Sequence, residues 1–400
     1  MTLNPSELPS FPSFSHWKGI SQYFPVQNDS VWLNYCGTTP VSTYAIDMMN
    51  LYFQEYARYG IFAPSFAEPV IKSKIKGYIS EILSCDPSEI GIVHNTSEGM
   101  NLYSHSIQIP KGKRILVLEN EYPSNVYPWE HWKEKGVGLD FIPVGKTPDE
   151  FLTNLKTELG KGDVYILSLS PVHWCTGVVF DMEAVSKLCE TNSTKLVIDG
   201  SQAVGHIPLD FGKLKVAFCA FAAWKWLLGP LGLGVVYLSK EESKGFKLIF
   251  KGQASVVNDS NYFPYRDEWK PAADQFEQST INFNDWIYFY ASLKMLSTLG
   301  FTRVRERIYE VAGMFKDAIH DLGFTLESDA FPQIKTGILA ITGHKDPSKF
   351  QPEAIQAFLK QRKITTAVRL GRLRMAPHIA IEEEHVTRVK EALSDYLNQS

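Results

Sequence analysis

The sequence predicts an α/β fold in two parts, a large domain built on a mostly parallel sheet and a smaller C-terminal α+β domain. Between Gly91 and Leu238, short apolar strand-like segments alternate with helical ones, which is the pattern of a parallel sheet whose strand ends carry the ligand. The clearest strands are expected at residues 114–119, 163–170, 195–199 and 233–239. A chain of 400 residues with 44% hydrophobic content can bury a large core, and its length favours two domains over one.

The domain boundaries follow from shifts in composition along the chain. Residues 1–30 are rich in Pro and Ser and are expected to form an N-terminal segment that packs on the small domain. The large domain is placed at 31–295 and the small domain at 296–400. Helices are expected at 43–60, 68–83, 285–300, 301–322, 352–362 and 382–398, and a strand at 336–343. Segment 242–273 has weak periodicity with many aromatic and charged residues, so we interpret it as a long excursion near the functional site.

Lys225 is the only charged residue in the apolar run from Phe218 to Leu238. The run is long enough for a membrane span, but glycines and a proline interrupt any helix there, and a central lysine would cost about 2.5–3.5 kcal/mol of insertion energy. We therefore expect a strand at 217–220, a turn that bears the lysine, a glycine-rich turn and a strand at 234–238. Because burial disfavours the ammonium form, such a lysine either becomes a nucleophile or is consumed in a Schiff base.

Asp199 ends the apolar strand at 195–199, so neighbouring strands could bring its carboxylate and Lys225 to one edge of the sheet. Pyridoxal phosphate needs this pair: a lysine for its aldehyde, and a carboxylate that keeps its ring nitrogen protonated. The alternative role of Asp199 is to cap a following helix.

Thr96 and Ser97 lie in a turn between the strand at 90–94 and a helix expected to open at about Glu98. Backbone amides at a helix N-terminus, with hydroxyl groups nearby, hold phosphate well. This turn is therefore the candidate phosphate site, and helix capping is its alternative role.

Seven segments resemble, in their order along the chain, the class V aminotransferases, a family of fold type I pyridoxal phosphate enzymes that includes cysteine desulfurases, kynureninase and several carbon–sulfur lyases. The segments are VWLNYCGTTPVS, NTSEGMN, ENEYPSNVYPW, DGSQAVG, AAWKWLLGPLGLG, FEQSTIN and VRLGRLRMAPH. Each motif alone is weak, but the shared order is specific and covers nearly the whole chain. The resemblance implies a fold type I transferase in which Lys225 holds pyridoxal 5'-phosphate as a Schiff base.

The resemblance also implies roles for residues around the cofactor. Tyr122 would stack on the pyridine ring, which is worth about 0.5–1.5 kcal/mol beyond burial, and Gln202 would hydrogen-bond the phenolic oxygen. Thr280 would contact the phosphate bound by a partner subunit, which implies a homodimer. The alternatives are a surface turn position for Tyr122 and an ordinary helix-start position for Gln202.

On the substrate side, the resemblance implies that Arg374 holds the carboxylate of an amino acid, since a guanidinium group can grip a carboxylate with two bonds. Arg369 and Arg372 are close rivals, or all three form a solvated basic cluster. Three arginines within six residues could also serve a second acidic group on the substrate. Gly37 belongs to the loop under the substrate, and Trp174 stands where desulfurases tend to carry a substrate-contacting asparagine.

The cysteines depart from the desulfurase pattern. Cysteine desulfurases carry a nucleophilic cysteine on a loop just before the carboxylate arginine, whereas none of the five cysteines here lies in 368–377. A standard persulfide-forming desulfurase is therefore not expected. Cys36 and Cys175 fall in motif loops and could approach the site, with a small buried hydrophobic position as their alternative.

Further departures predict a bulkier and more aromatic pocket. Trp224 and Ala222 stand where the family usually has histidine and serine, so two phosphate contacts could be missing. Gln275 replaces a common basic residue, and the stretch from Trp174 to Met182 is closer to the kynureninase pattern.

Composition excludes several other classes of function. The net charge of −4 gives no electrostatic case for binding nucleic acid or an anionic membrane. The ten histidines show no metal-ligand spacing, so no metal is expected. The N-terminal sequence lacks a secretory signal, and five unpatterned cysteines fit a reducing cytoplasm.

We therefore predict a pyridoxal phosphate enzyme acting on an α-amino acid, with transamination as the preferred reaction. Lys225 would move the α-proton: returning it to the cofactor gives transamination, whereas loss of a group from the β-carbon gives elimination. A carbon–sulfur lyase acting on cysteine or cystine without a persulfide cysteine is the close alternative. A kynureninase-like hydrolase and a non-catalytic cofactor-binding protein are further alternatives.

Overall fold

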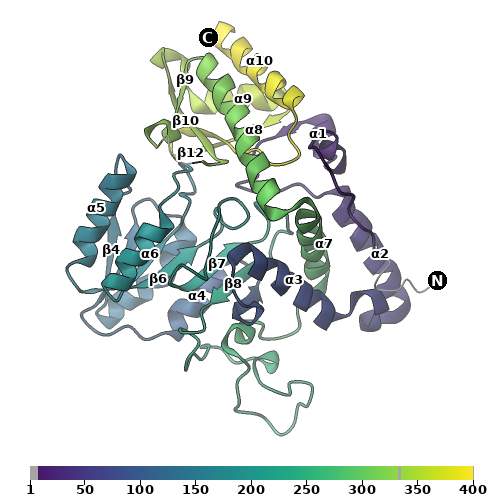
Figure 1. Cartoon of the computed structure of the whole chain (residues 1–400), viewed down its shortest axis with the longest axis vertical. Coiled ribbons are helices and arrows are strands. Elements are labelled where there is room, and N and C mark those ends of the chain that lie inside the picture. The colour runs from purple at the N-terminus through teal and green to yellow at the C-terminus, as the bar shows by residue number, and fades with distance from the viewer. Residues whose placement is uncertain (1–7, 332–334, 400) are drawn as a thin grey trace.

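The computed structural model describes residues 8–331 and 335–399 and confirms the α/β fold class (Figure 1). Its large sheet has seven strands in the order β2-β8-β7-β6-β5-β3-β4. These are β2 (Ile90–Val93), β3 (Arg114–Leu118), β4 (Gly138–Ile142), β5 (Val164–Leu169), β6 (Lys195–Asp199), β7 (Val216–Ala222) and β8 (Gly234–Leu238). The five strands from β7 to β4 pair in parallel, and only β8 runs antiparallel to its neighbours, so the sheet is mostly parallel as predicted.

Successive residues of the strands point to opposite faces of the sheet, and both faces are buried except at the edge strand β4, where only Ile142 is buried. In β7, Cys219 and Phe221 join one core cluster, while Phe218 and Ala220 join another. The first face is covered by α3 (Glu68–Leu83), α5 (Pro148–Leu159), α6 (Met182–Thr191) and α7 (Phe283–Leu299), and the second by α4 (Thr96–Ser106) and the 3-10 helix η7 (Tyr127–Lys135). Helix α2 (Thr43–Tyr59) packs on α7. This burial on both sides explains why the strands read as continuous apolar runs.

The small domain is a four-stranded antiparallel sheet with helices packed against it. The strand order is β12-β13-β10-β9. The elements are β9 (Phe324–Leu326), β10 (Leu339–His344), β12 (Ala367–Arg369), β13 (Arg372–Met375), α8 (Phe301–Asp321), α9 (Pro352–Gln361) and α10 (Glu383–Gln399). The long helix α8 connects the two parts of the molecule, as Figure 1 shows.

The N-terminal part of the chain contacts both domains. Strand β1 (Val31–Trp32) pairs in parallel with β11 (Ile364–Thr365) of the small domain. In contrast, the carbonyl oxygen of Pro9 accepts a hydrogen bond of 2.7 Å from the Tyr44 hydroxyl group on α2. Residues 1–7, 332–334 and 400, which belong to the predicted N-terminal segment and small domain, lie outside the described residues. The division at 30/31 and 295/296 stays a proposal.

Some element boundaries differ from those expected. Helix α4 begins at Thr96 and not at about Glu98, because the side chain of Asn95 caps the helix by accepting a hydrogen bond of 2.9 Å from the Glu98 amide. Strand β7 extends beyond the predicted 217–220 in both directions. Segment 242–273 is a long excursion as predicted, since it contains the short η8 (Gln253–Ser255), only the start of η9 (Ala272–Phe276) and one isolated bridge between Val256 and Trp269.

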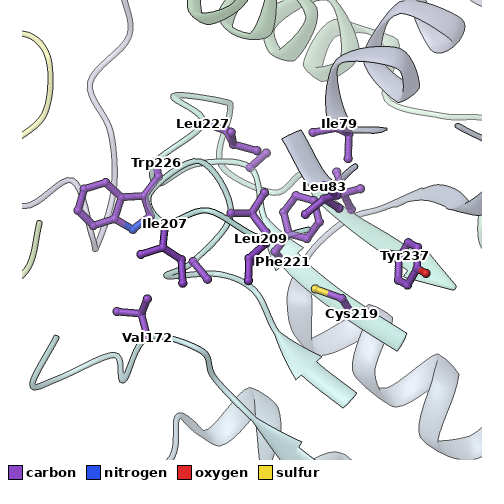
Figure 2. Packing of buried hydrophobic residues seen from close by; sticks show 14 of the residues in the cluster. Ile79, Leu83, Val172, Ile207, Leu209, Cys219, Phe221, Trp226, Leu227 and Tyr237 are labelled. Carbon is purple, nitrogen blue, oxygen red and sulfur yellow. The ribbon is translucent and has the colours of Figure 1, made fainter. Parts of the chain in front are cut away.

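Trp226, the residue after Lys225, packs in this core and contacts several segments of the chain. Figure 2 shows it packed in the first cluster with Ile207 and Leu227. Its indole stacks on His206 with ring centroids 4.0 Å apart. The Nε2 atom of His206 accepts a bond of 2.6 Å from the Gly337 amide, and His378 donates one of 3.1 Å to the Trp226 carbonyl oxygen. The lysine-bearing turn is therefore tied to two segments of the C-terminal part of the chain.

Candidate active site

A cavity of about 610 Å³ lies where the carboxyl ends of the parallel strands meet the N-terminus of α4 and the β12–β13 hairpin. A volume of this size suits a cofactor together with a small substrate. Nine of the predicted site residues line it: Gly37, Thr96, Ser97, Tyr122, Trp174, Gln202, Lys225, Arg369 and Arg374. Asp199 is buried beside the cavity, close enough for its charge to act on Lys225. Thr280 is exposed and does not line this cavity.

Lys225 presents its amine to the cavity. Its Nζ atom lies 5.7 Å from the centroid of the Tyr122 ring, and within the described part of the chain no hydrogen bond holds it. Burial lowers the pKa of Lys225, and the positive charge of Arg374 lowers it further, whereas Asp199 and Cys36 act in the opposite direction. The lysine is thus biased towards the neutral amine that can attack an aldehyde.

Asp199 is held at the end of β6, next to β7, which leads to the lysine-bearing turn. One of its oxygens accepts a hydrogen bond of 2.9 Å from the Ser201 amide. Burial raises the pKa of Asp199, while the charge of Lys225 and the bonds from Ser201 oppose the rise. A protonated ring nitrogen facing this carboxylate would supply the counter-charge that it lacks in the free protein.

Glu121 is a site residue that the sequence did not single out. This buried carboxylate accepts hydrogen bonds of 2.8 Å from the amides of Tyr122 and Ser170 and from the Ser170 hydroxyl group. Burial raises its pKa to about 7, and the nearby charge of Asp199 contributes. Its bonds fix the backbone of Tyr122. The sequence offered one indication of this role, since Glu121 directly precedes Tyr122, the residue predicted to stack on the cofactor.

The N-terminus of α4 has the features of a phosphate site. The hydroxyl groups of Thr96 and Ser97 lie 2.8 Å from the hydroxyl oxygen of Ser201 and 2.7 Å from that of Ser124, respectively. These two partner serines also line the cavity and were not predicted. Gly234 allows the close approach of the chain, because a Cβ atom there would lie 2.8 Å from the Cα atom of Asn95. Trp224 and Ala222, the positions where the family usually has histidine and serine, both line the cavity.

Gln202 connects the strand-end loop to the N-terminal loop. Its Nε2 atom donates a hydrogen bond of 2.8 Å to the carbonyl oxygen of Cys36, and its Oε1 atom accepts one of 3.1 Å from the indole of Trp226. One N–H of the Gln202 amide is left for a ligand. The same bonds hold the loop of Gly37 against the cavity.

The three arginines have different surroundings. Arg374 is 3% exposed, and its Nη1 atom donates a bond of 2.5 Å to the carbonyl oxygen of Trp174. Its Nε atom is buried without a hydrogen-bond partner in the described part of the molecule, which suits a ligand carboxylate. Arg372 is bound to Glu327 at 2.7 Å and does not line the cavity, whereas Arg369 lines its exposed rim.

These residues fit pyridoxal phosphate. Lys225 offers an unbonded amine, Asp199 a buried carboxylate, Tyr122 a ring face, and the start of α4 a set of amides and hydroxyl groups. Each group of the cofactor therefore meets side chains of matching chemistry.

The family model described as Aminotransferase class-V matches residues 31–389. The chain belongs to this family. It is a pyridoxal-phosphate-dependent enzyme, so the cofactor and enzyme class predicted from Lys225 and Asp199 are confirmed.

Curated relatives of this class-V aminotransferase family member carry different names. A probable cysteine desulfurase of Pyrococcus abyssi is 25% identical over 294 residues, covering 72% of each chain. The uncharacterized aminotransferase YcbU of Bacillus subtilis is 22% identical over 367 residues, covering 91% of this chain and 94% of the relative.

Solved structures share the fold. A cysteine desulfurase from Thermococcus onnurineus matches with a TM-score of 0.85 at 18% identity, covering 98% of this chain and all (100%) of that one. The cystine C-S lyase C-DES, solved with its product cysteine persulfide, matches with a TM-score of 0.83 at 21% identity, covering 93% and 99%.

The hairpin before Arg374 is too short to carry a catalytic loop. Arg369 pairs directly with Arg372, so only Leu370 and Gly371 form the turn, with positive φ angles of 47° and 73° as in a type I′ hairpin. Cys36 lines the cavity from another loop, while Cys175 lies outside it and donates to the carbonyl oxygen of Arg369 at 3.4 Å.

Two other features are absent from residues 8–331 and 335–399. No group of three or more His, Cys, Asp or Glu residues there could hold a metal ion. None of the helices in those ranges is both long and apolar enough to cross a membrane.

Proposed function

We propose that the protein cleaves a carbon–sulfur bond by β-elimination in a sulfur-bearing α-amino acid such as cystine. The observation that carries the proposal is the two-residue turn between Arg369 and Arg372, which leaves no loop for a persulfide cysteine next to the carboxylate-binding Arg374. Desulfurases and a cystine lyase among the relatives and structural neighbours support sulfur chemistry. The comparisons thus favour carbon–sulfur cleavage over the transamination that we preferred from the sequence.

In this reaction Arg374 would bind the α-carboxylate through its free Nε atom and so fix the orientation of the α-carbon. Pyridoxal phosphate, bound by Lys225, Asp199 and the start of α4, supplies the electron sink for negative charge at that carbon. The freed Lys225 amine, whose pKa is lowered by burial, would take the α-proton. The bond between the β-carbon and sulfur then breaks with its electron pair leaving on sulfur, and hydrolysis of the remaining fragment gives pyruvate and ammonia.

Product analysis tests this proposal. The cofactor-loaded protein is incubated with cystine or cysteine, and pyruvate, ammonia, sulfide and alanine are measured, with the Lys225→Ala variant as control. Stoichiometric pyruvate and ammonia are expected. Alanine as the main product would indicate a desulfurase, and loss of the visible absorbance band with recovery on adding a keto acid would indicate transamination.

The exposed position of Thr280 supports a second proposal, that it serves the site of a partner copy. Glu277, three residues before it, is buried and forms ion pairs with Lys76 at 3.0 Å and with Lys72, which fixes the start of the segment that leads to the exposed Thr280. Mixing Lys225→Ala and Thr280→Ala chains and allowing them to exchange would rebuild one intact site in each mixed dimer. Activity that stays at the level of the separate variants would contradict this arrangement.

A further inference from the structure

The β12–β13 hairpin carries a second cationic position at the mouth of the cavity. Residues directly opposite each other in an antiparallel pair point to the same face. Because Ala367 faces Arg374 and Arg369 faces Arg372, all three arginines lie on one face of the hairpin. Arg369 and Arg374 are diagonal neighbours, whose Cα atoms are typically about 7–8 Å apart.

Ion pairing distinguishes the two outer arginines. Glu327 binds Arg372 at 2.7 Å and neutralises it. Arg369 has no ion pair among the described residues, and its Nη1 atom donates only to the carbonyl oxygen of the adjacent Val368, at 2.7 Å. Arg369 thus retains a full positive charge on the rim of the cavity in which Arg374 lies at depth.

We propose that Arg369 is a specificity residue that binds a second anionic group at the far end of the substrate side chain. A substrate held by its α-carboxylate on Arg374 would direct a side chain a few atoms longer than that of cysteine towards the rim. The favoured class is then sulfur-bearing amino acids whose leaving group ends in a carboxylate, such as cystine and mixed disulfides of cysteine with thiol acids. This inference rests on the proposed carbon–sulfur cleavage.

Matched disulfides test the charge dependence. The mixed disulfides of cysteine with 3-mercaptopropionate and with 2-mercaptoethanol present the same broken bond but differ in the terminal carboxylate. For the wild-type enzyme we expect kcat/KM to be about five- to tenfold higher for the carboxylate form, the range of one partly exposed charged contact. Arg369→Gln should reduce this ratio to near one through KM, with kcat unchanged. Arg372→Gln, the control on the same face, should leave the ratio as it is.

Binding of analogues that cannot undergo the elimination separates this inference from the proposed function. 2-Aminosuberate replaces both sulfur atoms by methylene groups and keeps the distal carboxylate, which 2-aminooctanoate lacks. Their Kd values for the cofactor-loaded protein are read from calorimetry. If the wild type binds 2-aminosuberate more tightly and Arg369→Gln abolishes this preference, the subsite is supported. This holds even if no pyruvate forms from any disulfide, a result that would refute only the lyase proposal. Equal Kd values in the wild type, or equal effects of Arg369→Gln and Arg372→Gln, would overturn the subsite.

Discussion

Replacing Arg374 by Gln should weaken substrate binding strongly while leaving the fold intact. The buried guanidinium group has one satisfied bond, from Nη1 to the Trp174 carbonyl oxygen, and an Nε atom without a partner. A glutamine side chain is two atoms shorter and cannot reach the Trp174 carbonyl oxygen, so the variant should also lose about 1–3 kcal/mol of stability. The substrate carboxylate would lose two charge-assisted bonds, each worth about 1.5–3 kcal/mol, of which water and the amide recover a part. A net loss of about 3 kcal/mol corresponds to roughly a 100-fold fall in kcat/KM.

Calorimetry with matched ligands measures this loss. 2-Aminooctanoate and heptylamine differ only in the α-carboxylate, so the wild type should prefer the amino acid and the Arg374→Gln variant should lose that preference. The positive charge of Arg374 lowers the pKa of Lys225, so its removal should also move cofactor capture to higher pH. Unchanged preference for the amino acid, in a variant that still unfolds cooperatively, would refute the reasoning.

Three further outcomes are expected. Covalent capture of pyridoxal phosphate by the apo protein, followed by visible absorbance, should speed up as pH rises through the pKa of Lys225, because only the neutral amine reacts. The midpoint of this pH dependence should lie below 10.5, the ordinary pKa of lysine. Asp199→Asn should lower the midpoint further, because it removes a negative charge that favours the ammonium form. A midpoint at or above 10.5 would contradict this expectation. Cys36→Ser should keep pyruvate release within about threefold, because the proposed elimination needs no thiol. Release of alanine by the wild type that is lost in the variant would instead show thiol catalysis. Gly234→Ala should lower the free energy of unfolding by about 1–3 kcal/mol through overpacking and should weaken cofactor binding. The control Gly77→Ala lies in α3, where a Cβ atom would meet nothing within 4 Å, and should raise the free energy of unfolding by about 0.5–1 kcal/mol. Equal effects of the two variants in thermal unfolding would exclude the steric explanation.

The strands and the cofactor pair were predictable because their signals are local. Strand β6 is largely apolar and ends in Asp199, and Lys225 is the only charge in an otherwise apolar run. Adjacent parallel strands end at one edge, so the two side chains meet without any knowledge of distant contacts.

Other parts of the site depend on contacts between distant segments. Glu121 is a buried carboxylate whose pKa is raised to about 7 by burial and by the nearby charge of Asp199. Its partner Ser170 is likewise distant along the chain. The sequence could not rank Arg369 and Arg372, since both lie on one face of the hairpin. Their difference comes from Glu327, which is 45 residues away from Arg372 along the chain.

The contacts of Trp226 have a mechanical consequence. Its ring rests on His206, which grips Gly337, and its own carbonyl oxygen is held by His378. A Cβ atom at Gly337 would lie 3.0 Å from both His206 and the Trp226 ring, so these three residues are tightly packed. Any rotation of the small domain must therefore strain or shift the peptide next to Lys225. The visible absorbance of a cofactor bound to Lys225 would then report domain movement that begins far from the cofactor ring.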